Sequence, residues 1–203
     1  MPDIIYSSFD VINFTLLIFT AIIFFIGYTL APSVYFHKIK FLLAYPMWLN
    51  RLLESWIENK KITMAAFGSM FLLNAFFLTL SLLSGYIPFL PVILLLWMGI
   101  NIGVVTYHTM KGNFYFSYLF TPIALLELAA IFLTFTMAIN INIQKLNSTI
   151  LAPYSTAVKD MSLYWHTFLL LVIPLLLLAG IIELFLIRLS NRFMNGDDDD
   201  ESN

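Results

Sequence analysis

Cysteine is absent from this sequence of 203 residues, which excludes disulfide frameworks, thiolate metal sites and cysteine nucleophiles. Charged residues are also scarce: they make up 11% of the chain, whereas hydrophobic residues make up 61% and the mean hydropathy is +0.89. A soluble domain of this length could not bury so much apolar surface in one core. The composition therefore predicts a membrane protein.

The short motifs of common enzyme classes are missing as well. The sequence contains no HExxH pattern, no nucleophile elbow and no Gly-rich phosphate loop, and its three His residues do not have the spacing of metal ligands. We therefore predict that the protein is not an enzyme. We predict no cofactor, no metal site and no nucleic-acid partner.

Five stretches are long and apolar enough to cross a bilayer as helices, which takes about 20 residues each. They are Val11–Leu30, Met64–Ser84, Leu90–Thr109, Tyr115–Ile139 and Trp165–Ile187. No connecting segment is large enough for a soluble domain, so we predict an all-α fold in which residues 1–192 form one transmembrane helix bundle. The acidic end of the chain has no apolar side chain to bury from Asn195 to Asn203, and we predict a disordered tail over residues 193–203.

The segment between the first two predicted spans, residues 31–63, is too charged to cross a bilayer. After Pro46 its apolar residues recur at helical spacing, and they are Trp48, Leu49, Leu52, Leu53 and Trp56. This pattern predicts an amphipathic helix. Such a helix either lies in the membrane interface or packs against the ends of the protein's own spans, and the sequence does not decide between these positions.

Lys and Arg residues in short loops tend to stay in the cytoplasm, so their positions predict the orientation of the spans. An external amino terminus leaves only Lys145 and Lys159 outside. The residues then inside are Lys38, Lys40, Arg51, Lys60, Lys61, Lys111, Arg188 and Arg192. We therefore predict a multi-pass protein of the cell membrane with its carboxyl terminus in the cytoplasm.

Glu127 lies in the apolar run TPIALLELAAIF, near the middle of the fourth predicted span. A charge at that depth costs about 2.5–3.5 kcal/mol, so we expect this acid to face other helices and to be paired, hydrogen-bonded or protonated. Candidate partners in other spans are Asn74, Asn101 and Glu183. We favour interhelical packing over an ion site for Glu127. For Glu183, which is followed by Arg188, we favour a snorkelled or interfacial ion pair.

Two further features of the spans concern how helices pack. Gly99 and Gly103 are four residues apart in the third span, so the backbone of another helix can approach closely there. Pro122 and Pro174 each remove a backbone hydrogen-bond donor, and we predict a helix kink at each of them.

Four short motifs resemble the stage II sporulation protein M family, in the family's order and approximate spacing. They are Asn74-Ala75, the stretch Gly99–Gly103, the stretch Pro122–Ala130 and the stretch Ala179–Glu183. The resemblance covers roughly Phe67 to Leu189. The family usually has His-Gly after the proline of the fourth span, where this chain has Ile123-Ala124. The family's Glu has its counterpart in Glu127.

The resemblance implies a polytopic helical protein that works in a membrane complex with cell-wall-degrading partners. We therefore favour a non-catalytic scaffold that organises partners in the membrane. Its expected partners are the lipid bilayer and other membrane proteins, with copies of itself among the candidates. The alternative is a proton- or cation-coupled permease or channel that uses Glu127.

Overall fold

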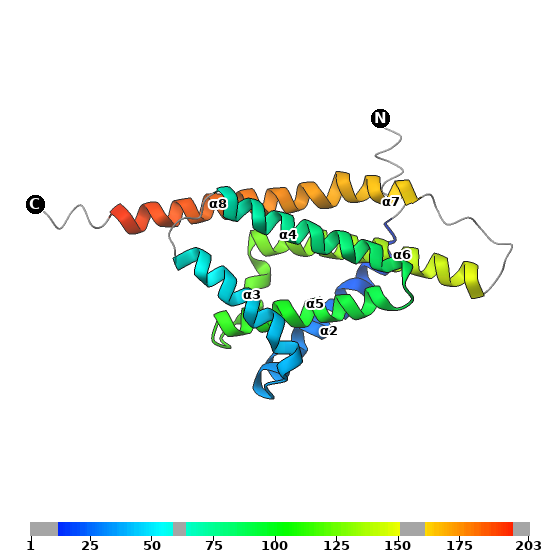
Figure 1. Cartoon of the computed structure of the whole chain (residues 1–203), viewed down its shortest axis with the longest axis horizontal. Helices are drawn as coiled ribbons and strands as arrows, with labels where there is room; N and C mark the ends of the chain where they lie inside the picture. The colour runs from blue at the N-terminus through cyan, green and yellow to red at the C-terminus, as the bar shows by residue number, and fades with distance from the viewer. Residues whose placement is uncertain (1–11, 59–63, 151–160, 197–203) are drawn as a thin grey trace, which may run out of the picture.

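The computed structural model describes residues 12–58, 64–150 and 161–196, and no strand occurs within these ranges. The helices form a bundle in which most of the long ones lie roughly along one direction, while the first two are inclined to it (Figure 1). In chain order they are α2 (Phe14–Phe36), α3 (Lys40–Glu58), α4 (Met64–Leu83), α5 (Leu90–Thr109), α6 (Pro122–Ile150), α7 (Met161–Thr167) and α8 (Ile173–Gly196). The all-helical class predicted from the sequence is confirmed.

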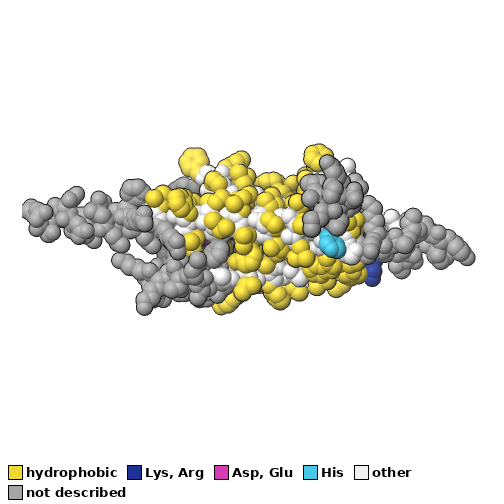
Figure 2. All heavy atoms as spheres, turned by 90° about the horizontal axis from the view of Figure 1, so that it is seen from above, with side chains coloured by type: hydrophobic (Ala, Val, Ile, Leu, Met, Phe, Trp, Pro, Cys, Tyr) yellow, Lys and Arg dark blue, Asp and Glu magenta, His cyan; other side chains and the backbone are white. Residues whose placement is uncertain are grey.

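Four helical segments of the described chain have the length and apolar composition of membrane spans. They are Phe14–Phe36, Leu90–Thr109, Pro122–Leu146 and Met161–Leu186, the last of which crosses from α7 into α8. At the second predicted span, α4 forms a helix, but its described apolar stretch is the shorter Phe71–Tyr86. Hydrophobic side chains cover the described middle of the molecule in the view of Figure 2. The chain is therefore a membrane protein with at least four candidate spans, and a fifth span stays a prediction.

The closest helix pair in the bundle is α2 and α5, which run in the same direction (Figure 1). A Cβ atom built on Gly103 would lie 2.6 Å from Cβ of Ala31 and 2.8 Å from the carbonyl oxygen of Tyr28. Gly99 fits as tightly against the carbonyl oxygen of Phe24, and Gly27 fits against that of Leu96. The helix that approaches the two glycines of α5 is therefore α2, and Gly27 of α2 allows the same close approach from the other side.

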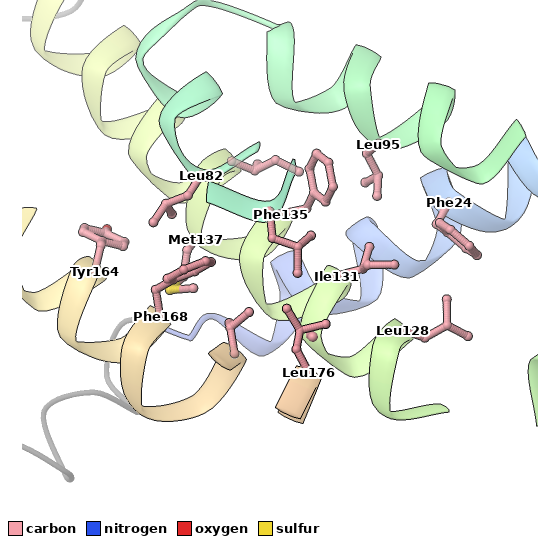
Figure 3. Packing of buried hydrophobic residues seen from close by; sticks show 14 of the residues in the cluster. Phe24, Leu82, Leu95, Leu128, Ile131, Phe135, Met137, Tyr164, Phe168 and Leu176 are labelled. Atoms are coloured by element: carbon pink, nitrogen blue, oxygen red, sulfur yellow. The ribbon is translucent and has the colours of Figure 1, made fainter. Parts of the chain in front are cut away.

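The helix α6 lies at the centre of the bundle, where it contacts α2, α4, α5 and α8. Figure 3 shows its side chains Leu128, Ile131 and Phe135 among residues from the surrounding helices. The neighbours drawn there include Phe24, Leu82, Leu95, Tyr164, Phe168 and Leu176. The core is thus built around a helix whose buried residues line several of its faces.

The structure corrects the predicted start of the fourth span. Residues Tyr115–Phe120 form a separate 3₁₀ helix, η2, and Thr121 is extended with φ −67° and ψ 144°. A residue before proline is driven to extended backbone, so the helix cannot run through Thr121 and begins at Pro122. Pro122 is therefore the first residue of α6, where a missing N–H costs nothing, and the predicted kink at Pro122 is wrong.

The fourth helix also ends later than predicted, at Ile150 instead of Ile139. Polar residues in this extension form tertiary hydrogen bonds: Gln144 Nε2 donates to Tyr164 Oη (2.8 Å), and Asn142 binds the turn between α4 and α5. At the carboxyl end, α8 includes residues 193–196, which the sequence assigns to a disordered tail. The acidic residues 197–203 lie outside the described part of the chain.

Pro174 lies at the second position of α8, directly after a π-helical turn, η3 (Phe168–Val172). Proline removes one hydrogen bond of the preceding turn, and a π turn is one way in which a helix absorbs such a loss. The regular α-helix of the last predicted span is therefore interrupted next to Pro174.

The helix α3 packs against the bundle through its first two turns. The ring of Phe41 contacts Trp97 of α5 (5.1 Å between centroids), and the ring of Tyr45 contacts Phe77 of α4 (6.0 Å). Trp48, from the predicted apolar stripe, is exposed. The side chains of Leu49, Leu52, Leu53 and Trp56 lie outside the described residues.

Candidate functional site

Two carboxylates from different helices lie near each other at one end of the bundle. Glu127 is five residues after the start of α6, so it is about 7.5 Å along the helix axis from Pro122 and not in the middle of a span. Glu183 belongs to α8, which packs against α6, and the two side chains repel each other electrostatically. The pairing of these two acids is decided by the packing of α6 on α8.

Tyr118 of η2 is the third member of this cluster. The residue is 36% exposed, but desolvation of its hydroxyl, followed by the negative charges of Glu127 and Glu183, raises the pKa of Tyr118 to about 12. The phenol is therefore neutral at physiological pH and has a proton to donate. The cluster combines two acceptors and one donor from three elements that are far apart in the sequence.

No hydrogen bond or ion pair joins Glu127 or Glu183 to another side chain within the described residues. The side chain of Arg188, the predicted partner of Glu183, lies outside the described part. Negative charges held near each other favour the uptake of a proton or a cation, which lowers their repulsion. The arrangement can therefore bind or release a positive charge.

The two asparagines predicted to accompany Glu127 lie elsewhere. Asn101 is buried in α5 with 9% of its surface exposed, and Asn74 is exposed on α4. Neither has an interaction with Glu127 in the part of the chain that the structure describes. Of the four polar residues singled out in the sequence, the structure brings together only Glu127 and Glu183.

Hydroxyl groups, which sequence reasoning passed over, connect the helices instead. Tyr28 Oη of α2 donates to the carbonyl oxygen of Tyr115 (2.8 Å) and lies 2.9 Å from Thr106 Oγ1 of α5. Thr20 of α2 and Thr136 of α6 meet at 3.2 Å between hydroxyl oxygens. Thr and Tyr inside apolar spans are the sequence signal that would have pointed to these contacts, since buried hydroxyls need partners.

Asn142 of α6 is the most connected of the residues missed in the sequence. Its Nδ2 donates to the carbonyl oxygens of Gly85 (3.1 Å) and Ile87 (2.7 Å), and its Oδ1 accepts from the backbone N–H of Phe89 (3.3 Å). One amide thus satisfies three backbone groups of the turn between α4 and α5, where Phe89 has a left-handed φ of 62°.

The comparison with known protein families gives a match over most of the chain. A family model described as stage II sporulation protein M matches residues 14–186, which includes α2 and extends well beyond the four motifs noted in the sequence. No curated protein and no solved structure matches the chain significantly.

Proposed function

The chain belongs to the stage II sporulation protein M family, and from this premise we propose that it is a non-catalytic membrane scaffold that holds other membrane proteins in a complex. The observation that carries this proposal is the exposed side chain of Asn74 on α4. Lipid tails offer no hydrogen bond to an amide, so an amide that faces outward from a membrane helix needs a partner from another helix.

The surroundings of Asn74 support a helix contact at this place. Leu78 and Ser81, four and seven residues further along α4, are on the same face and are buried in the bundle. At Asn74 this face is no longer covered by the chain's own described helices. A partner helix that lies along the open part of the face would pair with the amide and continue the packing.

The arrangement of α4 supports a fifth span. It runs opposite to α5 and beside α6 and α8 (Figure 1), and Asn74 lies near its middle. We also propose that α3 lies in the interface beyond its packed first turns, because Trp48 faces outward.

Affinity purification in mild detergent tests the scaffold proposal. The Asn74→Leu variant is expected to lose partners that the unchanged protein retains, because Leu cannot hydrogen-bond. Thr29→Val is the matched control: Thr29 is an exposed polar residue of α2, but its hydroxyl already donates to the carbonyl oxygen of Ile26 (2.9 Å). Recovery of the same partners with all three proteins would contradict the proposal.

The orientation is proposed as predicted, with the amino terminus outside and the carboxyl terminus in the cytoplasm. Lys38, Lys40 and Lys111 lie at the end of the bundle where α2 and α5 finish, whereas Lys145 lies at the opposite end, over the ring of Tyr86 (4.6 Å). This distribution supports a cytoplasmic position for the first end.

Because the chain has no cysteine, single cysteines report the orientation directly. Asn113 and Asn147 are exposed at opposite ends of the bundle and are suitable positions. In intact cells, an impermeant maleimide is expected to label Asn147→Cys and to spare Asn113→Cys. The reverse pattern would overturn the orientation.

The carboxylate pair favours a second function, a proton- or cation-coupled permease or channel. Glu127 and Glu183 interact electrostatically, and neither forms an ion pair with a basic side chain among the described residues, so their arrangement can accept a positive charge. Reconstitution into liposomes tests this function by ion flux. Flux that disappears in Glu127→Gln and in Glu183→Gln would replace the scaffold proposal, whereas absence of flux in all three folded proteins would leave the scaffold as the function.

A further inference from the structure

The parallel helices α2 and α5 end in the same way and at the same place. His37 and Met110 are their carboxyl-terminal caps, and each is followed by a lysine in left-handed conformation, Lys38 with φ 48° and Lys111 with φ 50°. Such a backbone is uncommon for a residue with a side chain, and here it occurs at corresponding positions of two packed helices.

Hydrogen bonds connect the ends of the two helices that carry these lysines. Tyr35 Oη lies 3.0 Å from Nδ1 of His108, which connects the last turns of the two helices. The backbone N–H of Lys38 donates to the carbonyl oxygen of Tyr35 (3.3 Å), and that of Lys111 donates to the carbonyl oxygen of His108 (3.2 Å). Each lysine is therefore anchored directly to one partner of the Tyr35–His108 pair.

Both lysines are exposed, and so is Lys40 at the start of α3. We call these three side chains the basic end. Large exposed aromatic side chains lie within three residues of these lysines in the sequence: Phe36, Phe41 (75% exposed) and Phe114 (88% exposed). The acids with described side chains are Glu127 and Glu183, and neither forms an ion pair with these lysines.

We propose that the basic end binds the headgroups of anionic phospholipids. It lies where two candidate spans leave the hydrocarbon layer, so lipid headgroups are its immediate neighbours. Phe side chains at this level enter the upper acyl region, while ammonium groups reach the phosphates. Zwitterionic lipids carry no net charge, and the basic end therefore selects lipids whose headgroup is net negative.

Lipid titration of the purified full-length chain tests this proposal. The protein in neutral detergent is titrated with dioleoylphosphatidylglycerol or with dioleoylphosphatidylcholine, and bound lipid is counted by native mass spectrometry. A lysine near a membrane surface contributes about fivefold in affinity for anionic lipid, so we expect the anionic lipid to bind at least about tenfold more tightly. The preference should decrease as salt is raised, since the attraction is electrostatic.

Three variants test whether lipid selectivity depends on the basic end in particular or on any lysine of the protein. The triple variant Lys38→Gln, Lys40→Gln, Lys111→Gln is expected to lose the preference, and the corresponding triple Lys→Arg variant is expected to keep it. Lys145→Gln, at the opposite end, is the matched control and should behave like the unchanged protein. Circular dichroism is used to check that each variant is folded. We expect all of them to fold, because the three lysines are exposed.

Several results would overturn the proposal. Equal affinity of the unchanged protein for the two lipids would show that the protein does not select anionic lipid. A preference that survives the triple Gln variant, or that Lys145→Gln reduces by the same amount, would mean that the basic end is not the site. Displacement of the lipid by an equal concentration of inorganic phosphate would assign the lysines to a free anion instead of a phospholipid.

Discussion

Gly99 of α5 lies directly against the backbone of Phe24 in α2, so that a methyl group on Gly99 would collide with the carbonyl oxygen of Phe24. A backbone atom cannot rotate away as a side chain can. We therefore expect Gly99→Ala to separate the two helices and to lower the free energy of unfolding by about 1–3 kcal/mol, as overpacking does.

Gly68→Ala is the control for this substitution, because a Cβ on Gly68 would meet nothing within 4 Å among the described atoms. Alanine is a better helix former than glycine, so this change should be neutral or stabilise the protein by up to about 1 kcal/mol. Both free energies are measured by denaturant titration in detergent micelles. Equal effects at the two positions would show that close contact is not the cause.

Asn142→Ala is expected to destabilise the turn between α4 and α5. The substitution removes partners from two carbonyl groups and one N–H of that turn. The bond to Gly85 is buried, and a buried group left without its partner costs about 1–3 kcal/mol. Hydrogen exchange should accelerate at the amide of Phe89. Asn147→Ala, on an exposed part of the same helix, should change neither the stability nor this exchange rate.

Tyr28 and Thr106 are expected to be energetically coupled through their hydroxyl groups. Tyr28→Phe removes the bonds to Thr106 and to the carbonyl of Tyr115 but keeps the ring, which stacks on Tyr115 at 5.4 Å between centroids. A double-mutant cycle with Thr106→Val should give a coupling energy of about 1 kcal/mol. Additive effects of the two changes would show that the contact contributes nothing.

Tyr118 should titrate at unusually high pH. Desolvation and the charges of Glu127 and Glu183 raise its pKa from the ordinary value of 10 to about 12, so the difference in tyrosinate absorbance between the unchanged protein and Tyr118→Phe should have its midpoint near pH 12. A midpoint near pH 10 would contradict the position of this residue in the cluster. Glu127→Gln or Glu183→Gln removes one negative charge, and each should lower the midpoint.

The same shift predicts how stability depends on pH. Between pH 10 and 12 the unfolded chain loses the Tyr118 proton while the folded protein keeps it, so the unfolded state binds fewer protons there. The contribution of Tyr118 to stability is therefore complete below pH 10 and is lost as the pH rises through 12. Tyr118→Phe should weaken this dependence.

The apolar runs of the sequence determined that this is an all-helical membrane protein, because stretches of about 20 apolar residues are stable in a bilayer only as helices. Local sequence also carried some packing information. Small residues four apart, Gly99 and Gly103, indicate a close helix contact whichever helix comes to occupy it. These inferences rest on features that each lie within one segment of the chain.

Only the tertiary structure decided which segments meet. An apolar helix offers many similar faces, so the sequence could not show that α2 is the partner of α5, that Glu127 lies near Glu183 instead of Asn74 or Asn101, or that Asn142 binds a turn more than 50 residues away. These pairings follow from the packing of side chains in three dimensions. The spacing of apolar residues in a sequence indicates which residues are buried, but it does not indicate which residues they pack against.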